Sequence, residues 1–128
     1  MTSAYVICIK DNVQSMQAAE RCKQSGNKYG FPISEYHAWT PADNPIEVLN
    51  QQKGVSTVNL DEVYSRTENC AAAFLSHFSL WEKCLESNKP VAVFEHDAVL
   101  MGPVDDRLTQ GFAYKQMINI GKPSYGQF

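Results

Sequence analysis

The chain has 128 residues, of which 44% are hydrophobic and 20% charged, which is the composition of a globular protein. Its length suits a single domain, 1–128, that can bury a core. The formal net charge is -3, and the sequence contains no basic run. Nucleic acid is therefore a poor candidate for a partner, because binding its backbone needs clustered Lys and Arg.

The cysteines and the apolar runs indicate the compartment. None of the four cysteines belongs to a CxxC pair, which argues against a zinc ribbon. We interpret them as buried or half-buried thiols in a reducing compartment, with two disulfides as the less favoured alternative. The apolar run over 4–9 is too short for a signal peptide, and no run approaches the roughly 18 apolar residues of a membrane span. The sequence therefore predicts a cytoplasmic protein.

The chain opens with a predicted strand and helix. The run over 4–9 (AYVICI) is typical of a central strand that is buried on both faces. Asp11 or Asn12 can cap the next helix, which we expect over 13–25 with Gly26 as its end. The apolar side of this helix is expected to consist of Val13, Met16 and Ala19, followed by either Cys22 or the aliphatic stem of Lys23.

The middle of the chain carries weaker signals. Residues 33–39 alternate well enough for a second strand. Two prolines then mark a loop, and a short helix is expected over 45–52. Residues 55–60 could form another strand or an extended loop.

A long helix is the clearest element of the second half. Apolar residues recur at spacings of three and four from 67 to 87, and Asn88 ends the pattern because Pro90 cannot continue a helix. We expect its three aromatic residues to lie in the core. The apolar positions are Ala71, Phe74, Leu75, Phe78, Trp81 and Leu85.

The remaining elements complete an alternating order. We expect a strand over 91–94, a turn at Gly102-Pro103, a short helix that starts at Asp105 or Asp106, and a last strand over 115–120. Strands that alternate with helices indicate an α/β fold, with a mostly parallel sheet and helices on both faces. An uncovered last edge would favour self-association into a homo-oligomer.

The predicted strand over 91–94 runs directly into Glu95-His96-Asp97. If the strand continued, Glu95 and Asp97 would share a face, with Cα atoms about 6.6 Å apart, and His96 would point the other way. Two carboxylates at the end of a buried strand repel each other and lose hydration. Protonation, basic partners or a divalent cation would remove that cost, and Mg²⁺ or Mn²⁺ suits these ligands. The alternative is a solvated loop after Phe94.

Two blocks carry a resemblance to a known family. They are LSHFSLWEKC over 75–84 and VAVFEHDAVL over 91–100. Together they resemble glycosyltransferase family 25, the lipopolysaccharide β-1,4-galactosyltransferases and collagen galactosyltransferases, whose members carry an LSH-x-x-LW helix and an apolar strand ending in Glu-Asp-Asp. The opening YVICIKDN over 5–12 is similar to the first strand of that family.

The resemblance implies a fold and a function. The fold would be a shortened GT-A-like, Rossmann-like domain that binds a nucleotide sugar. The reaction would transfer a galactose-like hexose from a UDP-sugar to a saccharide or another hydroxyl acceptor. By position, Asp97 would bind Mn²⁺ (or Mg²⁺), and Glu95 would assist the metal or the nucleotide. The cation would neutralise charge on the departing diphosphate.

Five further residues are candidates for the nucleotide-sugar site. Lys10, Asp11 and Asn12 follow the first strand, where a Rossmann-like sheet has its ligand crevice, although helix capping explains Asp11 or Asn12 equally well. Ser76 and His77 belong to the LSH block. Their alternative role is structural, since a helix serine often bonds back to a carbonyl. The catalytic base is not identified.

Departures from the family pattern keep two alternatives open. His96 replaces the middle acidic residue, the family's Gly-Glu-x-Gly-Cys is NCAAA over 69–73 here, and family domains are longer. The first alternative is an inactive, shortened relative that serves as a nucleotide-binding or structural interaction module. The second is a Mg²⁺-dependent phosphoryl-transfer or hydrolytic domain, which would need a nucleophilic Asp where the first strand ends. Asp11 lies slightly beyond that place.

Overall fold

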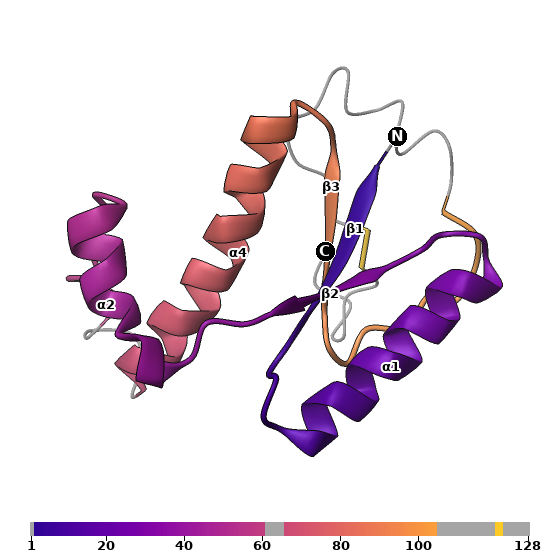
Figure 1. Ribbon diagram of the computed structural model, residues 1–128, viewed down its shortest axis with the longest axis horizontal. Coiled ribbons are helices and arrows are strands. Elements are labelled where there is room, and N and C mark those ends of the chain that lie inside the picture. The colour runs from indigo at the N-terminus through magenta and orange to yellow at the C-terminus, as the bar shows by residue number, and fades with distance from the viewer. Residues whose placement is uncertain (1, 61–65, 105–119, 122–128) are drawn as a thin grey trace.

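A three-stranded parallel sheet forms the centre of the molecule in the computed structural model, which describes residues 2–60, 66–104 and 120–121 (Figure 1). Its strands are β1 (Ser3–Cys8), β2 (Ser34–His37) and β3 (Val91–Glu95), in the order β2-β1-β3. The helices α1 (Val13–Lys28) and α4 (Thr67–Ser87) lie on opposite sides of the sheet (Figure 1). This arrangement is the predicted α/β fold and is compatible with a Rossmann-like architecture.

Strand β1 is central, as predicted, but it is not equally buried on its two faces. Ala4, Val6 and Cys8 are buried and belong to the core beneath α1. Tyr5 and Ile7, on the opposite face, are half-buried. The prediction of full burial on both faces is therefore wrong for the α4 side, where part of the surface lines a cavity.

Helix α1 begins where the sequence predicts and ends later. Asn12 caps it by accepting a 2.9 Å hydrogen bond from the Ser15 N–H. The expected stop at Gly26 is wrong, because this glycine is buried inside the helix, where the chain from Phe31 to Ile33 crosses it closely. Val13 is exposed rather than apolar core, since the buried side of the helix starts at Ser15.

The segment between β2 and α4 packs against α4 as a second small core. It contains the short helical turns η1 (Pro41–Asp43), α2 (Pro45–Glu47) and η2 (Val48–Gln52), so the helix predicted over 45–52 is present, with its second half in π form. Residues 54–59 form a loop with a turn rather than a strand. The second core consists of Val48, Leu49, Ala71 and Leu75.

Helix α4 has the predicted bounds and ends at Asn88, which adopts the left-handed conformation with φ of 53°. The prediction that its aromatic residues lie in the core is wrong, because Phe74 is 38% exposed and Trp81 is 41% exposed. Phe78 lies between them, half-buried, and the three rings contact one another with centroids 5.9–6.2 Å apart. The buried side consists of Ala71, Ala72, Leu75, Ser76 and Leu80. Small residues bring the helix backbone close to the rest of the fold, and the bulky rings occupy its outer side.

The last predicted elements fall largely outside the described residues. Gly102 lies at a bend, as expected for the turn. The short helix from Asp105 or Asp106 and the strand over 115–119 lie in residues that the structure does not describe. In the described ranges, no helix is both long and apolar enough to cross a membrane.

Candidate functional site

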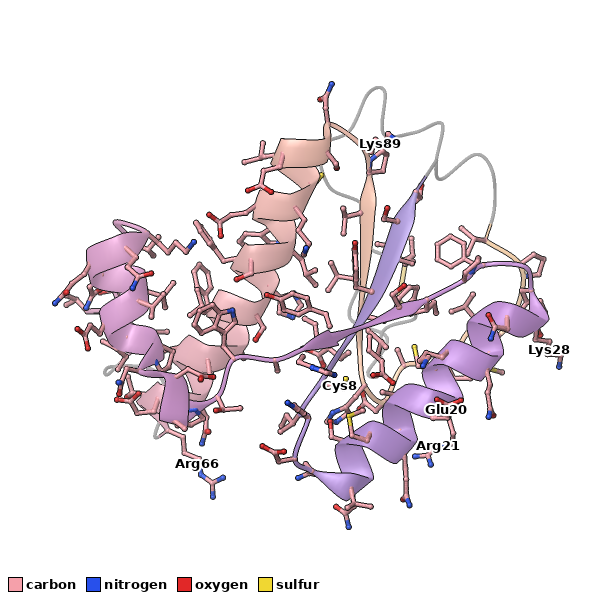
Figure 2. All side chains as sticks on the ribbon, in the orientation of Figure 1. Cys8, Glu20, Arg21, Lys28, Arg66 and Lys89 are labelled. Carbon is pink, nitrogen blue, oxygen red and sulfur yellow. The ribbon has the colours of Figure 1, made fainter. Side chains whose placement is uncertain are left out.

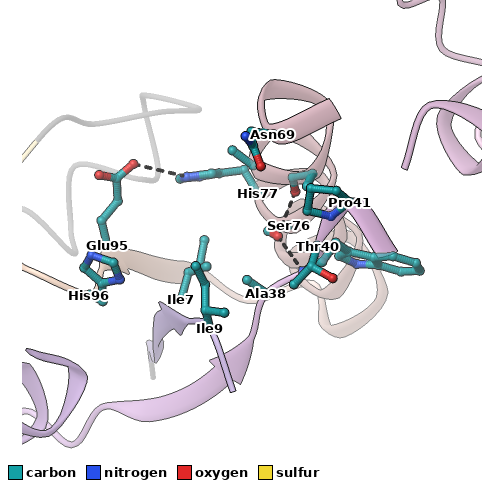
Figure 3. A pocket seen from close by; sticks show the side chains of 13 residues that line it. Ile7, Ile9, Ala38, Thr40, Pro41, Asn69, Ser76, His77, Glu95 and His96 are labelled. Atoms are coloured by element: carbon teal, nitrogen blue, oxygen red, sulfur yellow. Dashed lines mark hydrogen bonds and ion pairs between the residues drawn. The ribbon is translucent and has the colours of Figure 1, made fainter. Parts of the chain in front are cut away.

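A cavity of about 260 Å³ lies beyond the carboxyl ends of the strands, on the α4 side of the sheet (Figure 3). In open parallel sheets this edge is where ligands bind, because loops from several strands meet there. The walls come from the end of β1, the segment after β2, the first half of α4 and the end of β3. They include Ile7, Ile9, Ala38, Trp39, Thr40, Pro41, Asn69, Ala72, Ala73, Ser76, His77, Glu95 and His96.

Glu95 and His77 form a polar pair at this cavity. The Glu95 Oε1 atom lies 3.8 Å from the His77 Nε2 atom, and the dashed line in Figure 3 marks this contact. The Glu95 side chain is 75% exposed, so it remains available to a ligand. The structure therefore brings two of the predicted nucleotide-sugar residues together, one from α4 and one from β3.

Ser76 lies at the same cavity, but its hydroxyl already has two partners. It accepts a 2.9 Å hydrogen bond from the Trp39 N–H and donates one of 2.9 Å to the Ala72 carbonyl (Figure 3). The second of these is the bond back to a carbonyl that the alternative, structural role of Ser76 predicts. Ser76 thus ties the chain leaving β2 to α4, and this contact shapes the cavity wall.

His96 also lines the cavity, but its ring contacts α1, whereas Glu95 lies beside α4. Its Nδ1 atom lies 2.8 Å from the Ser15 Oγ atom of α1. That hydroxyl also accepts a 2.8 Å hydrogen bond from the Ile9 N–H, so its own proton is free to go to Nδ1. The arrangement favours the His96 tautomer that carries its proton on Nε2. The middle residue of the triplet therefore joins β3 to β1 and α1.

Asp97 lies in the turn that follows β3 and is exposed. The strand ends at Glu95, so the alternation that would place Glu95 and Asp97 on one face does not extend to Asp97. Among the residues that the structure describes, the only cluster of three His, Cys, Asp or Glu ligand atoms within 4.8 Å of one another lies elsewhere. Both carboxylates are exposed, and carboxylate oxygens are the kind of ligand that Mn²⁺ or Mg²⁺ takes, but Asp97 is not among the residues that line the cavity.

Lys10, Asp11 and Asn12 are not part of this cavity. Lys10 and Asp11 line a separate cavity with Glu20 and Glu35, against α1. Asn12 caps α1. The prediction for these residues relied on strand order alone, and the structure shows that the chain leaving β1 turns toward α1.

Sequence reasoning missed the wall formed after β2. Trp39, Thr40 and Pro41 line the cavity, and Asn69 faces them from α4. A usable signal was present, since a strand over 33–39 was predicted and the carboxyl end of a parallel strand lies at the ligand edge. That these residues line the cavity could be seen only from the register of β2 against β1.

Comparison with known proteins gives a direct match. Residues 1–119 match the family model described as glycosyltransferase family 25 (LPS biosynthesis protein). The match includes both blocks, over 75–84 and 91–100, on which the resemblance rests, and confirms it. No curated protein matches the chain.

Proposed function

The chain belongs to glycosyltransferase family 25, and from that premise we propose that it transfers a hexose, galactose-like, from a UDP-sugar to a saccharide or another hydroxyl acceptor. Sugar transfer, with an activated donor and an acceptor as partners, follows from the family. The nucleotide, the sugar, the acceptor, the metal dependence and the GT-A type of fold are parts of the proposal. The observation that carries it is the position of Glu95 at the rim of a cavity beyond the carboxyl ends of parallel strands.

The size and lining of the cavity support a nucleotide as its occupant. About 260 Å³ is slightly below the roughly 300–1,000 Å³ of sites that enclose a whole ligand. The cavity would therefore enclose only part of the donor. The apolar walls from Ile7, Ile9, Trp39 and Pro41 suit a flat base, and the diphosphate would extend toward the polar rim at Glu95 and His77.

Mn²⁺, or Mg²⁺ in its place, would be held by Glu95 and Asp97 together with the donor's phosphate oxygens. Bound there, the cation supplies positive charge next to the leaving nucleoside diphosphate. The chain's own groups prepare this position. The His77 Nε2 atom lies 3.8 Å from one Glu95 oxygen, so the imidazole stands beside the proposed ligand. His96 contacts α1 rather than α4, so its presence in place of an acidic residue leaves Glu95 accessible.

A cytoplasmic location is part of the same proposal. All four cysteines are free thiols in the structure, which supports a reducing compartment.

Metal-dependent binding of a nucleotide sugar tests the proposal. We expect Mn²⁺ and a UDP-hexose together to raise the melting temperature of the chain more than either alone, because the donor's phosphate oxygens would ligate the cation and the cation would neutralise their charge. Asp97→Ala should abolish the part of the shift that depends on Mn²⁺, since it removes a predicted metal ligand. Differential scanning fluorimetry with a panel of UDP- and GDP-sugars measures both effects.

Glu86→Ala is the matched control, because it removes one carboxylate near the carboxyl end of α4 and should leave the shift intact. An Asp97→Ala variant that keeps the full Mn²⁺-dependent shift would exclude Asp97 from the site. Binding without hydrolysis or transfer in a product assay would instead support the inactive, nucleotide-binding alternative.

A further inference from the structure

A second group of candidate ligands lies on the α1 side of the sheet, separate from the cavity at Glu95. It comprises Cys8 at the end of β1 with Glu35 and His37 on β2, and we name it the Cys8–Glu35–His37 cluster. Cys8 pairs with His37 across the parallel strands, and Glu35 is two residues before His37, so the three side chains share one face. One ligand atom from each lies within 4.8 Å of the others.

The donor types in this cluster suit zinc. A thiolate sulfur, an imidazole nitrogen and a carboxylate oxygen are the three ligand classes that Zn²⁺ accepts in proteins. The Glu35 Oε2 atom lies 3.6 Å from the His37 Nε2 atom. Two ligands of a tetrahedral zinc at bonds of roughly 2.0–2.1 Å lie about 3.4 Å apart, so this pair needs little movement to bind the ion.

Lys23 supports the cluster rather than blocking it. Its Nζ atom lies 3.2 Å from Glu35 Oε1, which is the oxygen that does not face His37. A contact of this kind orients a ligating carboxylate from outside the metal shell. Lys23 also lies 3.5 Å from Glu20. With a thiolate at Cys8, the two carboxylates and the Lys23 ammonium, the local charge is -2, which one Zn²⁺ would neutralise.

The surroundings leave a path to the cluster. The buried Cys8 thiol donates a long hydrogen bond of 3.8 Å to the Tyr36 carbonyl. His37 is 50% exposed, and Glu35 and Glu20 line an open cavity along α1. Figure 2 labels Cys8 at the end of β1 and Glu20 on the neighbouring α1. Solvent therefore reaches two of the three candidate ligands, Glu35 and His37, while Cys8 is buried beneath them.

The geometry points to a zinc site in which Cys8, Glu35 and His37 supply three ligands and water supplies the fourth. Binding replaces the Cys8 proton, which goes to solvent, with a sulfur–zinc bond. The site is independent of the proposed Mn²⁺ position, because Glu95 faces α4 and the Cys8–Glu35–His37 cluster faces α1.

Titration of the full chain with Zn²⁺, and separately with Co²⁺ as a spectroscopic substitute, tests this site under reducing conditions. We expect one equivalent to bind, with Co²⁺ showing the visible absorption of tetrahedral coordination and the near-ultraviolet band of a thiolate ligand. His37→Gln should weaken Zn²⁺ binding by at least about 10-fold, because it removes a ligand. This residue is half exposed, so its replacement leaves the core unchanged.

Two variants separate a true ligand set from adventitious binding. Cys8→Ser should remove the near-ultraviolet band, whereas Cys22→Ser, which removes the other buried thiol, should keep it. His77→Gln, at the other cavity, should bind Zn²⁺ as the unmodified chain does. The inference is overturned if His37→Gln binds Zn²⁺ as tightly as the unmodified chain, or if bound Co²⁺ shows no thiolate band.

Discussion

Single hydrogen bonds in this protein connect elements that are distant in sequence. Ser76 joins α4 to the chain leaving β2, and Ser15 joins α1 to both Ile9 and His96. Both serines are buried, so water cannot replace either hydroxyl as a hydrogen-bond partner. The two residues hold opposite sides of the sheet edge at which the proposed donor binds.

Replacement of Ser76 should test this role in stability. In Ser76→Ala the N–H of the half-buried Trp39 loses its acceptor, which we expect to lower the free energy of unfolding by about 1–3 kcal/mol. Urea denaturation followed by tryptophan fluorescence measures the change. Ser87→Ala is the control, since that hydroxyl makes an exposed 3.4 Å contact, and its effect should stay within about 0.5 kcal/mol. Equal losses in the two variants would contradict the assigned role.

In the helices, the residues that are buried are not always those that the spacing of apolar residues predicts. In α4, Phe74 and Trp81 recur at helical spacing and still lie on the outer side, while Ala72 and Ser76 face the interior. In α1, Gly26 is a packing residue rather than a stop. Its carbonyl accepts a 2.8 Å hydrogen bond from the Phe31 N–H, and the returning chain contacts the helix at that point.

Gly26→Ala is expected to destabilise the protein although alanine is the better helix former. A Cβ atom there would overlap the Phe31 carbonyl oxygen and lie 2.7 Å from Ile33 Cδ1, and a backbone atom cannot rotate away as a side chain can. The overpacking cost of about 1–3 kcal/mol should exceed the helix gain of about 1 kcal/mol.

The change in the urea midpoint measures the result for Gly26→Ala. Gly102→Ala is its control, because an added Cβ meets nothing within 4 Å and the stability should stay within about 0.5 kcal/mol. A Gly26→Ala variant that is more stable than the unmodified chain would show that the crossing segment shifts without cost.

Over the whole molecule, the sheet separates two sets of polar groups. Glu95 and His77 lie on the α4 side, and Cys8, Glu35 and Lys23 lie on the α1 side. The division explains how one small sheet can carry a proposed donor site and a proposed zinc site without shared ligands. Self-association of the chain stays a prediction.

Stability of the whole chain should fall as the pH rises above about 9. Burial raises the pKa of the Cys8 thiol from 9.0, with a further contribution from Glu35, and burial raises the pKa of Cys22. Above pH 9.0 the unfolded chain therefore loses these protons while the folded chain keeps them, which favours unfolding. The hydrogen bond to Glu35 raises the pKa of Lys23 above 10.5, so its stabilisation is also lost at still higher pH.

Urea denaturation in zinc-free buffer at intervals from pH 7.5 to 10.5 measures this decline. Cys22→Ser should make the fall above pH 9 smaller, because it removes one of the two thiols. A free energy of unfolding that stays constant or rises across this range would contradict the assignment.

Within the described residues, the sequence by itself determined most of the helices and strands, their order and the family. Local features were sufficient for these: the helical spacing over 67–87, the Asn12 cap, the proline after Asn88 and the two blocks over 75–84 and 91–100. Each depends on residues that are close together in the chain.

Only the tertiary structure decided which faces are buried and which polar groups meet. The outward aromatic side of α4, the separation of Lys10 from Glu95, and the meeting of Cys8 with His37 all depend on strand register and helix docking. These contacts join residues far apart in sequence. Their free energy comes from packing across elements, and no local periodicity encodes it.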